Sequence, residues 1–338
     1  MKDVVVDHEK LKAIVADKFK KVDVSSDDAD IIADVLTHAD LRNVSSHGVL
    51  RTERYISHLL NKGINNNPDI KIESTGLVSV KADGDNGMGQ VTFKKAAEEA
   101  IRMSQDKGVG IAGVINSEHC GALSYFVEMA AENDMIGIAM TNANKLVVPF
   151  GGADPFFGTN PMAFGFPAEV HSPIILDMAT SNVAFGKILH ARETKEKIPE
   201  SWGLDKNGEP TDDPEQVSVL QPIAGPKGYG LGLVVDVLSG ILTNSPFGLQ
   251  IAPFQSFEVP RSLGHFFMAL NPEILTSKNL FKKQIDDLID ELHQQRTAKH
   301  FDSVLVPGEP EQITKDRRLK EGIPVPESIY EYLISSRL

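Results

Sequence analysis

The sequence predicts an α/β protein whose central sheet region is flanked by helices at both ends of the chain. Residues 1–70 carry apolar side chains at helical spacing and show no strand alternation. Strand-like and helical segments then alternate from Ile70 to Asp177, a pattern typical of an α/β sheet. Beyond Gly225 the pattern is again largely helical, so we expect the two chain ends to frame the sheet.

The N-terminal part is predicted to form helices over 6–22, 27–41 and 49–61. Ser25 and Ser26 precede two acidic residues, which makes a good N-cap for the second helix. Gly63 can end the third helix, and the Asn-rich stretch after it is typical of a linker.

The central part is predicted to contain short apolar strands separated by helices. The expected strands are 70–73, 78–82, 109–115, 136–141 and 174–176, and the expected helices are 90–105 and 183–192. The polar stretch 193–216 is expected to be a long ordered loop, and loops of that length are often functional.

The C-terminal part is expected to be mainly helical and to pack on the N-terminal helices. The expected elements are an apolar helix over 225–242, a strand over 266–270, a helix capped by Ser277 and running to about 296, a strand at 304–306, and helices near 312–320 and 327–335. The predicted divisions are therefore 1–72 (helical), 73–229 (α/β) and 230–338 (mainly helical).

Composition excludes several classes of function. The 338 residues carry a net charge of −13, which argues against nucleic-acid binding and against anionic membrane surfaces. The single cysteine, Cys120, excludes an intrachain disulfide and a zinc site built from several cysteines. No apolar run approaches the length of a spanning helix, and no residue spacing indicates a metal site. We expect a cytoplasmic protein.

The best candidate for acid/base chemistry is His119. The expected strand 109–115 runs into the polar turn 116–119, and Gly121 then allows a helix to begin. Ligands of open α/β sheets bind at the carboxyl ends of strands, and histidine titrates near neutral pH. A structural histidine is the alternative. A hydrolase dyad of Ser117 with His119 is a weaker idea, because no Gly-x-Ser-x-Gly elbow surrounds Ser117.

A candidate anion site lies at Ser46, His47 and Arg51. Ser46 is expected at a helix start, and His47 and Arg51 are four residues apart, on one face of the expected helix. An arginine in that position matches a carboxylate in a bidentate manner. The alternative is a capped surface helix with a solvated arginine.

A glycine-rich helix start at 225–232 could hold a diphosphate through Lys227 and backbone N–H groups. The dinucleotide fingerprint is absent, because position 233 is leucine and no strand comes immediately before this segment. Spacing alone therefore gives only a weak phosphate signal.

These motifs together resemble the malate/L-lactate dehydrogenase family that is unrelated to the classical Rossmann enzymes. The resemblance covers nearly the whole chain. It is carried by Val44-Ser45-Ser46-His47-Gly48-x-x-Arg51, Ser117-x-His119-x-Gly121, Pro149-Phe150-Gly151-Gly152, Gly158-Thr159-Asn160-Pro161, Asp177-Met178-Ala179-Thr180-Ser181, Gly225-Pro226-Lys227-Gly228 and Pro307-Gly308-Glu309.

The resemblance implies a three-layer α/β/α domain with a mixed sheet, which binds NAD without a Rossmann fold. It further implies a helical domain built from both chain ends, and a homodimer or a dimer of dimers. It does not decide between NAD and NADP.

The resemblance also implies roles for individual residues. His119 matches the family's proton acceptor and His47 matches a proton donor of a relative, so both compete for the acid/base role. Ser46 and Arg51 match substrate contacts. The positions that match cofactor contacts are Ala143, Asp177, Met178, Ala179, Lys227, Gly308 and Glu309.

The implied activity is NAD-dependent oxidation of a small 2-hydroxy acid. Within the family, Ile198-Pro199-x-x-Trp202 and Asp205-Lys206-Asn207-Gly208 look like members that convert (S)-ureidoglycolate to oxalurate in purine breakdown. The alternatives are a dehydrogenase for malate, lactate or another 2-hydroxy acid, and a non-catalytic protein that binds small anions.

Overall fold

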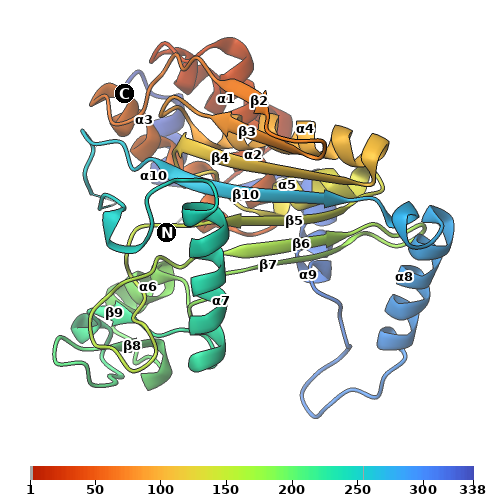
Figure 1. Ribbon diagram of the computed structural model, residues 1–338. Coiled ribbons are helices and arrows are strands. Elements are labelled where there is room, and N and C mark those ends of the chain that lie inside the picture. Colours follow the sequence, from red (N-terminus) through yellow and green to blue (C-terminus); the bar gives the residue numbers. More distant parts are fainter. Residues whose placement is uncertain (1–2, 254) are drawn as a thin grey trace.

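The computed structural model describes residues 3–253 and 255–338, and its centre is a seven-stranded sheet (Figure 1). The strand order is β2-β3-β4-β10-β5-β6-β7. Among neighbouring pairs in this sheet β3–β4 is parallel and the others are antiparallel, which confirms the expectation of a mixed sheet. The strands are β2 (Lys71–Ser74), β3 (Ser79–Asp83), β4 (Val109–Ser117), β5 (Ile136–Thr141), β6 (Met162–Phe166), β7 (Ile174–Met178) and β10 (Leu263–Leu270).

The register brings several strand ends to one edge of the sheet. Ser117 at the end of β4 pairs with Leu263 at the start of β10, and His265 pairs with Thr141 at the end of β5. Met162 at the start of β6 pairs with Met178 at the end of β7. The carboxyl ends of β4, β5 and β7 therefore lie together, and we refer to this edge as the site edge.

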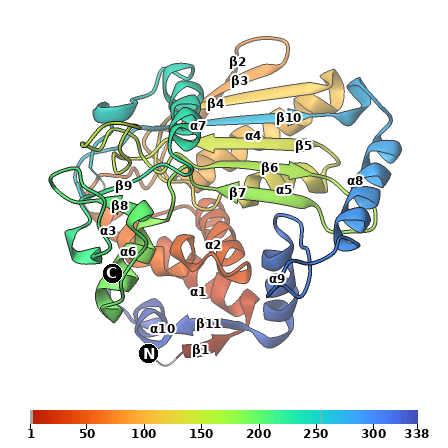
Figure 2. The ribbon, with the colours of Figure 1, turned by 90° about the horizontal axis from the view of Figure 1, so that it is seen from below.

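Helices cover the two faces of the sheet unequally (Figures 1 and 2). On one face α4 (Gly89–Lys107) and α5 (Ser124–Glu132) pack against the strands in a continuous apolar core. On the other face α7 (Pro226–Asp236) continues into a π-helical turn, Val237–Ile241, and buries a smaller cluster around Val235. The first of these layers is therefore more complete than the second.

The N-terminal helices share a separate apolar core with the end of the chain. This core joins α1 (His8–Lys20), α2 (Ser26–Leu41), α3 (Thr52–Leu60) and α10 (Glu327–Ile334) with two short strands. These strands, β1 (Asp3–Val6) and β11 (Ile323–Pro326), pair in antiparallel fashion, and α9 (Glu309–Glu321) lies beside α2 (Figure 2).

The structure corrects several element assignments made from the sequence. The strands β1, β6 and β11 were not expected, and residues 304–306 do not form the expected strand. The strand β6 lies in a segment rich in Gly and Pro, and β1 and β11 are four residues long and pair across the whole chain. Local periodicity cannot reveal such strands.

The segment 230–338 also differs from the helical segment that was expected. Its strand β10 is longer than the predicted 266–270 and lies in the middle of the sheet, between β4 and β5. The segment thus contributes to both cores, because its later elements β11 and α10 pack with the N-terminal helices. The helix α8 (Lys278–His293) starts where predicted, with the Ser277 hydroxyl accepting the Leu280 N–H.

The polar stretch 193–216 is more structured than a loop. It contains two single 3₁₀ turns and the strand β8 (Gly203–Leu204), which pairs with β9 (Val219–Leu220) beside α6 (Phe185–Thr194). Within the described ranges 3–253 and 255–338, no helix is both long enough and apolar enough to cross a bilayer.

Candidate active site

His119 lies at the site edge, in the turn that follows β4. Gly121, two residues later, has φ of +85°, and a Cβ there would stand 2.7 Å from Cγ1 of Val35. This position therefore needs glycine both for its backbone conformation and for its close approach to α2. The turn continues to α5, which begins at Ser124 rather than directly after Gly121.

One ring nitrogen of His119 is held by two hydrogen-bond partners. The Tyr55 hydroxyl lies 2.6 Å from Nδ1, and the Gly121 N–H donates to the same nitrogen at 3.3 Å. Because the backbone N–H can only donate, Nδ1 is the acceptor, and the tyrosine hydroxyl donates to it as well. The proton of the neutral ring is thereby assigned to Nε2.

The sequence-predicted residues Ser46, His47 and Arg51 lie beside His119. The rings of His47 and His119 are stacked, with centroids 5.3 Å apart and an interplanar angle of 24°. The Ser46 hydroxyl lies 2.9 Å from Nδ1 of His47, and Nε of Arg51 donates to the Ser46 carbonyl at 2.6 Å. The structure thus brings together all four residues that the sequence singled out for acid/base work and substrate contact.

The local backbone around these residues differs from the expected helix. Residues Ser45–His47 and Val49–Arg51 form two 3₁₀ turns separated by Gly48, and α3 begins only at Thr52. A Cβ at Gly48 would stand 2.2 Å from Oδ1 of Asp40, whose Oδ2 accepts the Val49 N–H at 2.7 Å. The expectation that His47 and Arg51 share one face of an α-helix is therefore wrong, and this buried carboxylate shapes the segment instead.

Both histidines of the site are neutral at physiological pH. Desolvation, reinforced by the positive charge of Arg51, lowers the pKa of His47 to about 4. Desolvation, His47 and Arg51 together lower the pKa of His119 well below its usual value. A neutral imidazole can accept a proton, so His119 is in the protonation state that a general base requires, although the lowered pKa makes it a weaker base.

A buried ion pair adjoins His119. Glu118 and Arg261 form it, with side chains only 1% and 3% exposed. The Glu118 carboxylate also accepts the backbone N–H of His119 at 2.9 Å. Burial lowers the pKa of Arg261 to about 9, so the guanidinium remains charged at neutral pH.

A second buried histidine connects the ends of two strands at the site edge. His265 of β10 is fully buried, with Nε2 3.0 Å from the Ser117 hydroxyl and Nδ1 2.7 Å from the Thr141 hydroxyl. It therefore braces the end of β4, which leads to His119, against the end of β5. Ser117 bonds to this histidine and not to His119 in the structure, so the hydrolase dyad considered from the sequence is not formed.

Asn160 links one expected cofactor position, Ala143, to the helix α7 that carries another, Lys227. The buried Asn160 side chain accepts the Ala143 N–H at 3.3 Å and donates to the Gly232 carbonyl of α7 at 2.9 Å. Lys227 is exposed in the first turn of the same helix, and no side chain caps the α7 N-terminus. Pro226 has no N–H, and the Gly228 N–H already donates to the Ile223 carbonyl at 2.8 Å, so Lys227 is the main donor at this helix start that suits the diphosphate of a dinucleotide.

The remaining cofactor positions lie along β7, some at its end and some near its start. Asp177, at the end, accepts the Ser124 N–H at the start of α5 at 2.7 Å, and Met178 and Ala179 follow it along the chain. Gly308 packs against Ile175, the second residue of β7, and Glu309 accepts from the Val306 N–H at 3.0 Å and lies 2.9 Å from Nε2 of His293. Only Asp177, Met178 and Ala179 of these positions therefore lie at the site edge.

A cavity borders the start of α7. Its volume is about 410 Å³, and it is lined by residues 148–152, 221–222 and 224–225, with Asn182, Ser201 and Leu204. The motif Pro149–Gly152 thus lies next to the glycine-rich helix start, at the entrance to the cofactor positions.

Sequence reasoning missed five residues of this corner: Tyr55, Glu118, Arg261, His265 and Asn160. Tyr55 lies four residues after Arg51, and that spacing is a signal that could have placed it near the same site. Asn160 is part of a quoted motif. Arg261 and His265 reach the site only through the placement of β10, for which no local pattern exists.

Comparison with known proteins agrees with this arrangement. Residues 6–334 match the family model described as malate/L-lactate dehydrogenase. The chain is 40% identical to ureidoglycolate dehydrogenase (NAD(+)) of Escherichia coli, over 98% of this chain and 96% of that protein. It is also 40% identical to malate dehydrogenase of Pyrococcus abyssi, over 96% and 92% of the two chains.

A solved structure shows the same fold. Sulfolactate dehydrogenase from Methanocaldococcus jannaschii superimposes with a TM-score of 0.92 at 39% identity, covering 98% of this chain and 95% of that one. The cofactor differs among relatives, since a sulfolactate dehydrogenase of Chromohalobacter salexigens, 29% identical, is named for NADP(+). On these findings the chain belongs to the malate/L-lactate dehydrogenase family of NAD(P)-dependent 2-hydroxy acid dehydrogenases.

Proposed function

We propose that this enzyme oxidises (S)-ureidoglycolate to oxalurate with NAD, in the breakdown of purines through allantoin. The observation that carries the proposal is the stacked His47–His119 pair, which is hydrogen-bonded to Tyr55 and lies within the electrostatic influence of Arg51 at the sheet edge. The 40% identity to an NAD(+)-dependent ureidoglycolate dehydrogenase over nearly the whole chain supports this substrate.

Arg51 would hold the substrate carboxylate, and Ser46 and His47 would orient the substrate. A guanidinium binds a carboxylate through two parallel charge-assisted hydrogen bonds, which fix direction as well as distance. Arg51 already donates through Nε to the Ser46 carbonyl at 2.6 Å, and this bond limits the orientations of its guanidinium. A fixed carboxylate would present C2 and its hydroxyl to the Tyr55–His119 pair.

His119 would receive the proton of the substrate hydroxyl. Because Nδ1 accepts from Tyr55, we propose that the substrate hydroxyl gives its proton to the Tyr55 oxygen while Tyr55 passes its own proton to Nδ1. Burial raises the pKa of Tyr55 to about 12, so the tyrosine stays neutral before and after the transfer. His119 ends as an imidazolium and returns the proton when the reaction runs in reverse.

Bound NAD would supply the acceptor for the hydride that leaves C2. Lys227, at the start of α7, would hold its diphosphate. The other residues proposed to contact it are Ala143, Asp177, Met178, Ala179, Gly308 and Glu309. Asp177, Met178 and Ala179 at the end of β7 would set the nicotinamide beside the turn that carries His119, where proximity and orientation contribute to the rate.

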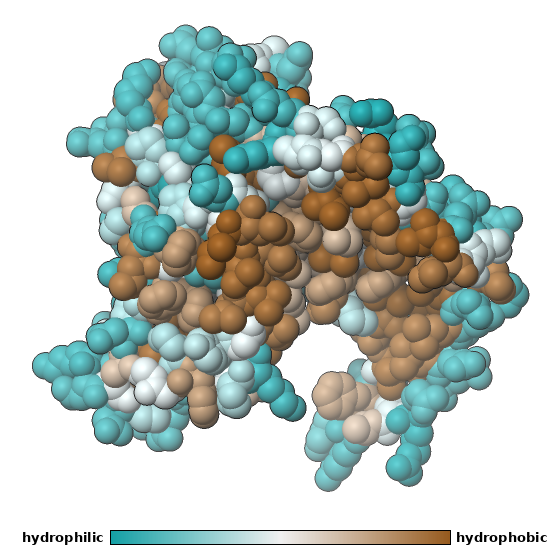
Figure 3. Space-filling view, viewed as in Figure 1, coloured by the Kyte–Doolittle hydropathy of each residue, from teal (hydrophilic) through white to brown (hydrophobic). Residues whose placement is uncertain are grey.

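The enzyme is further proposed to be a homodimer that buries the face carrying α7. Figure 3 shows apolar side chains gathered over the middle of this face and extending toward α8. Six apolar side chains of α7, the π-helical turn and the residue that follows it are between 38% and 62% exposed. They are Leu231, Leu233, Val234, Val237, Ile241 and Leu242. Patches of this kind mark interaction surfaces, and the molar mass from light scattering would test the proposal.

A steady-state substrate panel tests the function. Ureidoglycolate, malate, lactate and sulfolactate would each be supplied with NAD or NADP, and reduction followed at the absorbance band of the reduced nicotinamide. Ureidoglycolate with NAD should give the highest kcat/KM. A higher value for malate would favour the second candidate, a malate dehydrogenase, which the 40% identity to the Pyrococcus abyssi enzyme supports. No turnover with any 2-hydroxy acid would leave a non-catalytic anion-binding protein.

A further inference from the structure

The ion pair between Glu118 and Arg261 changes the charge of the site. Three guanidinium groups, those of Arg51, Arg54 and Arg261, influence one another in this corner. Arg54 lies over the Phe257 ring at 4.9 Å, whereas Arg261 is buried against the Glu118 carboxylate. The positive charge of Arg261 is therefore compensated within the chain before any substrate arrives.

Arg261 is close enough to the reacting groups for this compensation to matter. The charges of Arg51 and Arg261 both act on the Tyr55 hydroxyl, which lies 2.6 Å from His119. A substrate held at that hydroxyl with its carboxylate on Arg51 is consequently within the electrostatic range of Arg261 and Glu118. The substituent on C2 is the part of the substrate whose charge differs among 2-hydroxy acids.

We propose that Glu118 is a specificity-determining residue, which neutralises Arg261 and thereby disfavours substrates whose C2 substituent carries a second anionic group. Glu118 and Arg261 are buried, so they act on a distal carboxylate through space: the Glu118 carboxylate would repel it, and the attraction of Arg261 is already compensated. A neutral amide or ureido group is not repelled by the Glu118 carboxylate and can still form hydrogen bonds. The inference rests on the proposed 2-hydroxy acid oxidation and narrows its substrate to monoanions.

The test compares two substrates of nearly equal size, malate and its β-monoamide, in which the distal carboxylate becomes a neutral amide. The variants are Glu118→Gln, Arg261→Gln and the double variant. Glutamine keeps the oxygen that accepts the His119 N–H and removes only the charge. Glu118→Gln should raise the malate-to-monoamide ratio of kcat/KM about tenfold, or about 1.4 kcal/mol.

The other two variants should change the malate-to-monoamide ratio of kcat/KM in different ways. Arg261→Gln leaves the Glu118 carboxylate without its counter-charge and should lower the ratio, and the double variant should restore it to near the wild-type value. If Glu118→Gln fails to fold, Arg261→Gln alone still carries the test. An unchanged ratio in the folded single variants, or a change of the same sign in both, would overturn the inference.

Glu128→Gln is the matched control, because Glu128 and Arg42 form a second buried ion pair, with side chains 8% and 3% exposed. This variant should lower stability without moving the substrate ratio. If wild-type enzyme turns over no 2-hydroxy acid, the proposed function fails, and the inference is tested by thermal shift. The measured quantity would be the rise in Tm with malonate minus the rise in Tm with malonamate, its monoamide. This difference should be larger for Glu118→Gln than for wild type, and equal differences would refute the inference.

Discussion

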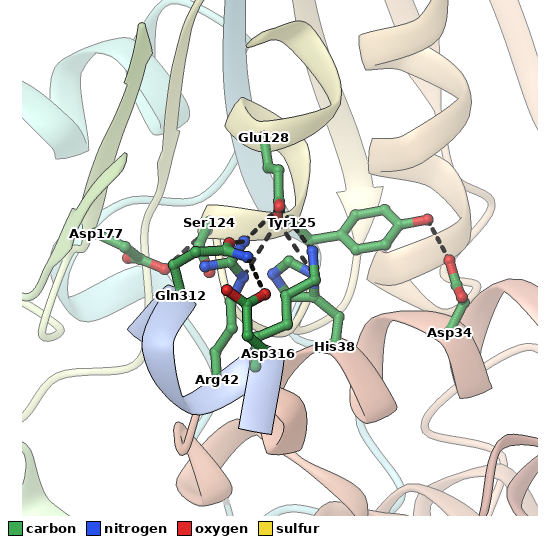
Figure 4. A network of polar contacts seen from close by, with 10 residues as sticks. Asp34, His38, Arg42, Ser124, Tyr125, Glu128, Asp177, Gln312 and Asp316 are labelled. Atoms are coloured by element: carbon green, nitrogen blue, oxygen red, sulfur yellow. Dashed lines mark hydrogen bonds and ion pairs between the residues drawn. The ribbon is translucent and has the colours of Figure 1, made fainter. Parts of the chain in front are cut away.

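Two corners of the molecule contain the same kinds of residue but differ in charge balance. The active-site corner has the buried pair Glu118–Arg261 beside His119, and the corner between α2, α5 and α9 has the buried pair Glu128–Arg42 beside His38 (Figure 4). In the second corner Glu128 accepts from Arg42 at 3.1 Å and from Lys315 at 2.8 Å, and lies 3.4 Å from His38.

The basic residues Lys12, Arg42 and Lys315 of the second corner each have a carboxylate partner within the chain. Three acidic residues, Glu9, Asp34 and Glu132, lie with Glu128 around a cavity of about 250 Å³, and Lys12 and Lys315 also line it. In the active-site corner the guanidinium groups of Arg51, Arg54 and Arg261 lie close enough to act on one another. The comparison teaches that both corners use buried pairs for structure, while the active-site corner also gathers three guanidinium groups, whose field favours an anionic ligand.

Removing the histidine from each corner should give the sharpest contrast. His119→Ala is expected to lower kcat by about 10²–10⁴-fold, because a general base contributes that much to proton transfer. His38→Ala, its counterpart, should leave kcat nearly unchanged and lower only the stability. Steady-state kinetics on both variants checks this, and near-normal turnover of His119→Ala would remove His119 from its proposed role.

Breaking the ion pair of the second corner should affect folding and not catalysis. Glu128→Gln leaves the buried Arg42 and Lys315 without their carboxylate, so the free energy of unfolding should fall by about 3 kcal/mol. Urea denaturation measures this loss, and kcat of the folded variant should stay within about twofold of wild type. A large fall in kcat would mean that the two corners are coupled.

Removing the arginine proposed as the carboxylate clamp should act on substrate binding. Arg51→Ala is expected to raise KM by about 10–100-fold, since a charge-assisted contact contributes about 1.5–3 kcal/mol. The value of kcat should change less than KM. An unchanged KM for the 2-hydroxy acid would argue against the clamp, and the KM for NAD is the internal control.

Acidification should weaken both corners through their buried histidines. Desolvation lowers the pKa of His38, His47 and His58 to about 4 and that of His265 to about 3. Below pH 6.5 these histidines bind protons in the unfolded chain, whereas in the folded chain they stay neutral until about pH 4. The free energy of unfolding therefore falls across this window. The free energy of unfolding should drop by about 2 kcal/mol or more between pH 7 and pH 5.

Four acidic groups oppose this trend. Burial raises the pKa of Asp40 and of Asp236 to about 6 and also raises the pKa of Glu132 and of Asp177, so the folded state takes up these protons before the unfolded chain does as the pH falls. The pKa shifts of the histidines are larger, so the net effect stays destabilising. Urea titrations of wild type and His38→Gln at both pH values would separate the contributions of the two corners, and a rise in stability toward pH 5 would contradict the assignment.

Much of the fold could be predicted from local pattern. The helices α1, α2, α4 and α8 and the strands β4 and β5 repeat apolar residues at the period of their own secondary structure, and their predicted bounds agree with the structure to within a few residues. The chemical character of the site could also be read, because His119 follows a strand and Ser46, His47 and Arg51 are close in sequence.

Tertiary structure alone decided the rest. The strand β10 enters the sheet between β4 and β5, which brings Arg261 to Glu118 and His265 to Ser117 across more than a hundred residues of chain. The short pair β1–β11 joins the two chain ends in the same way. Local sequence determines which segment forms a helix or a strand, but contacts between distant segments depend on the whole packed core, and these contacts set the charge around His119.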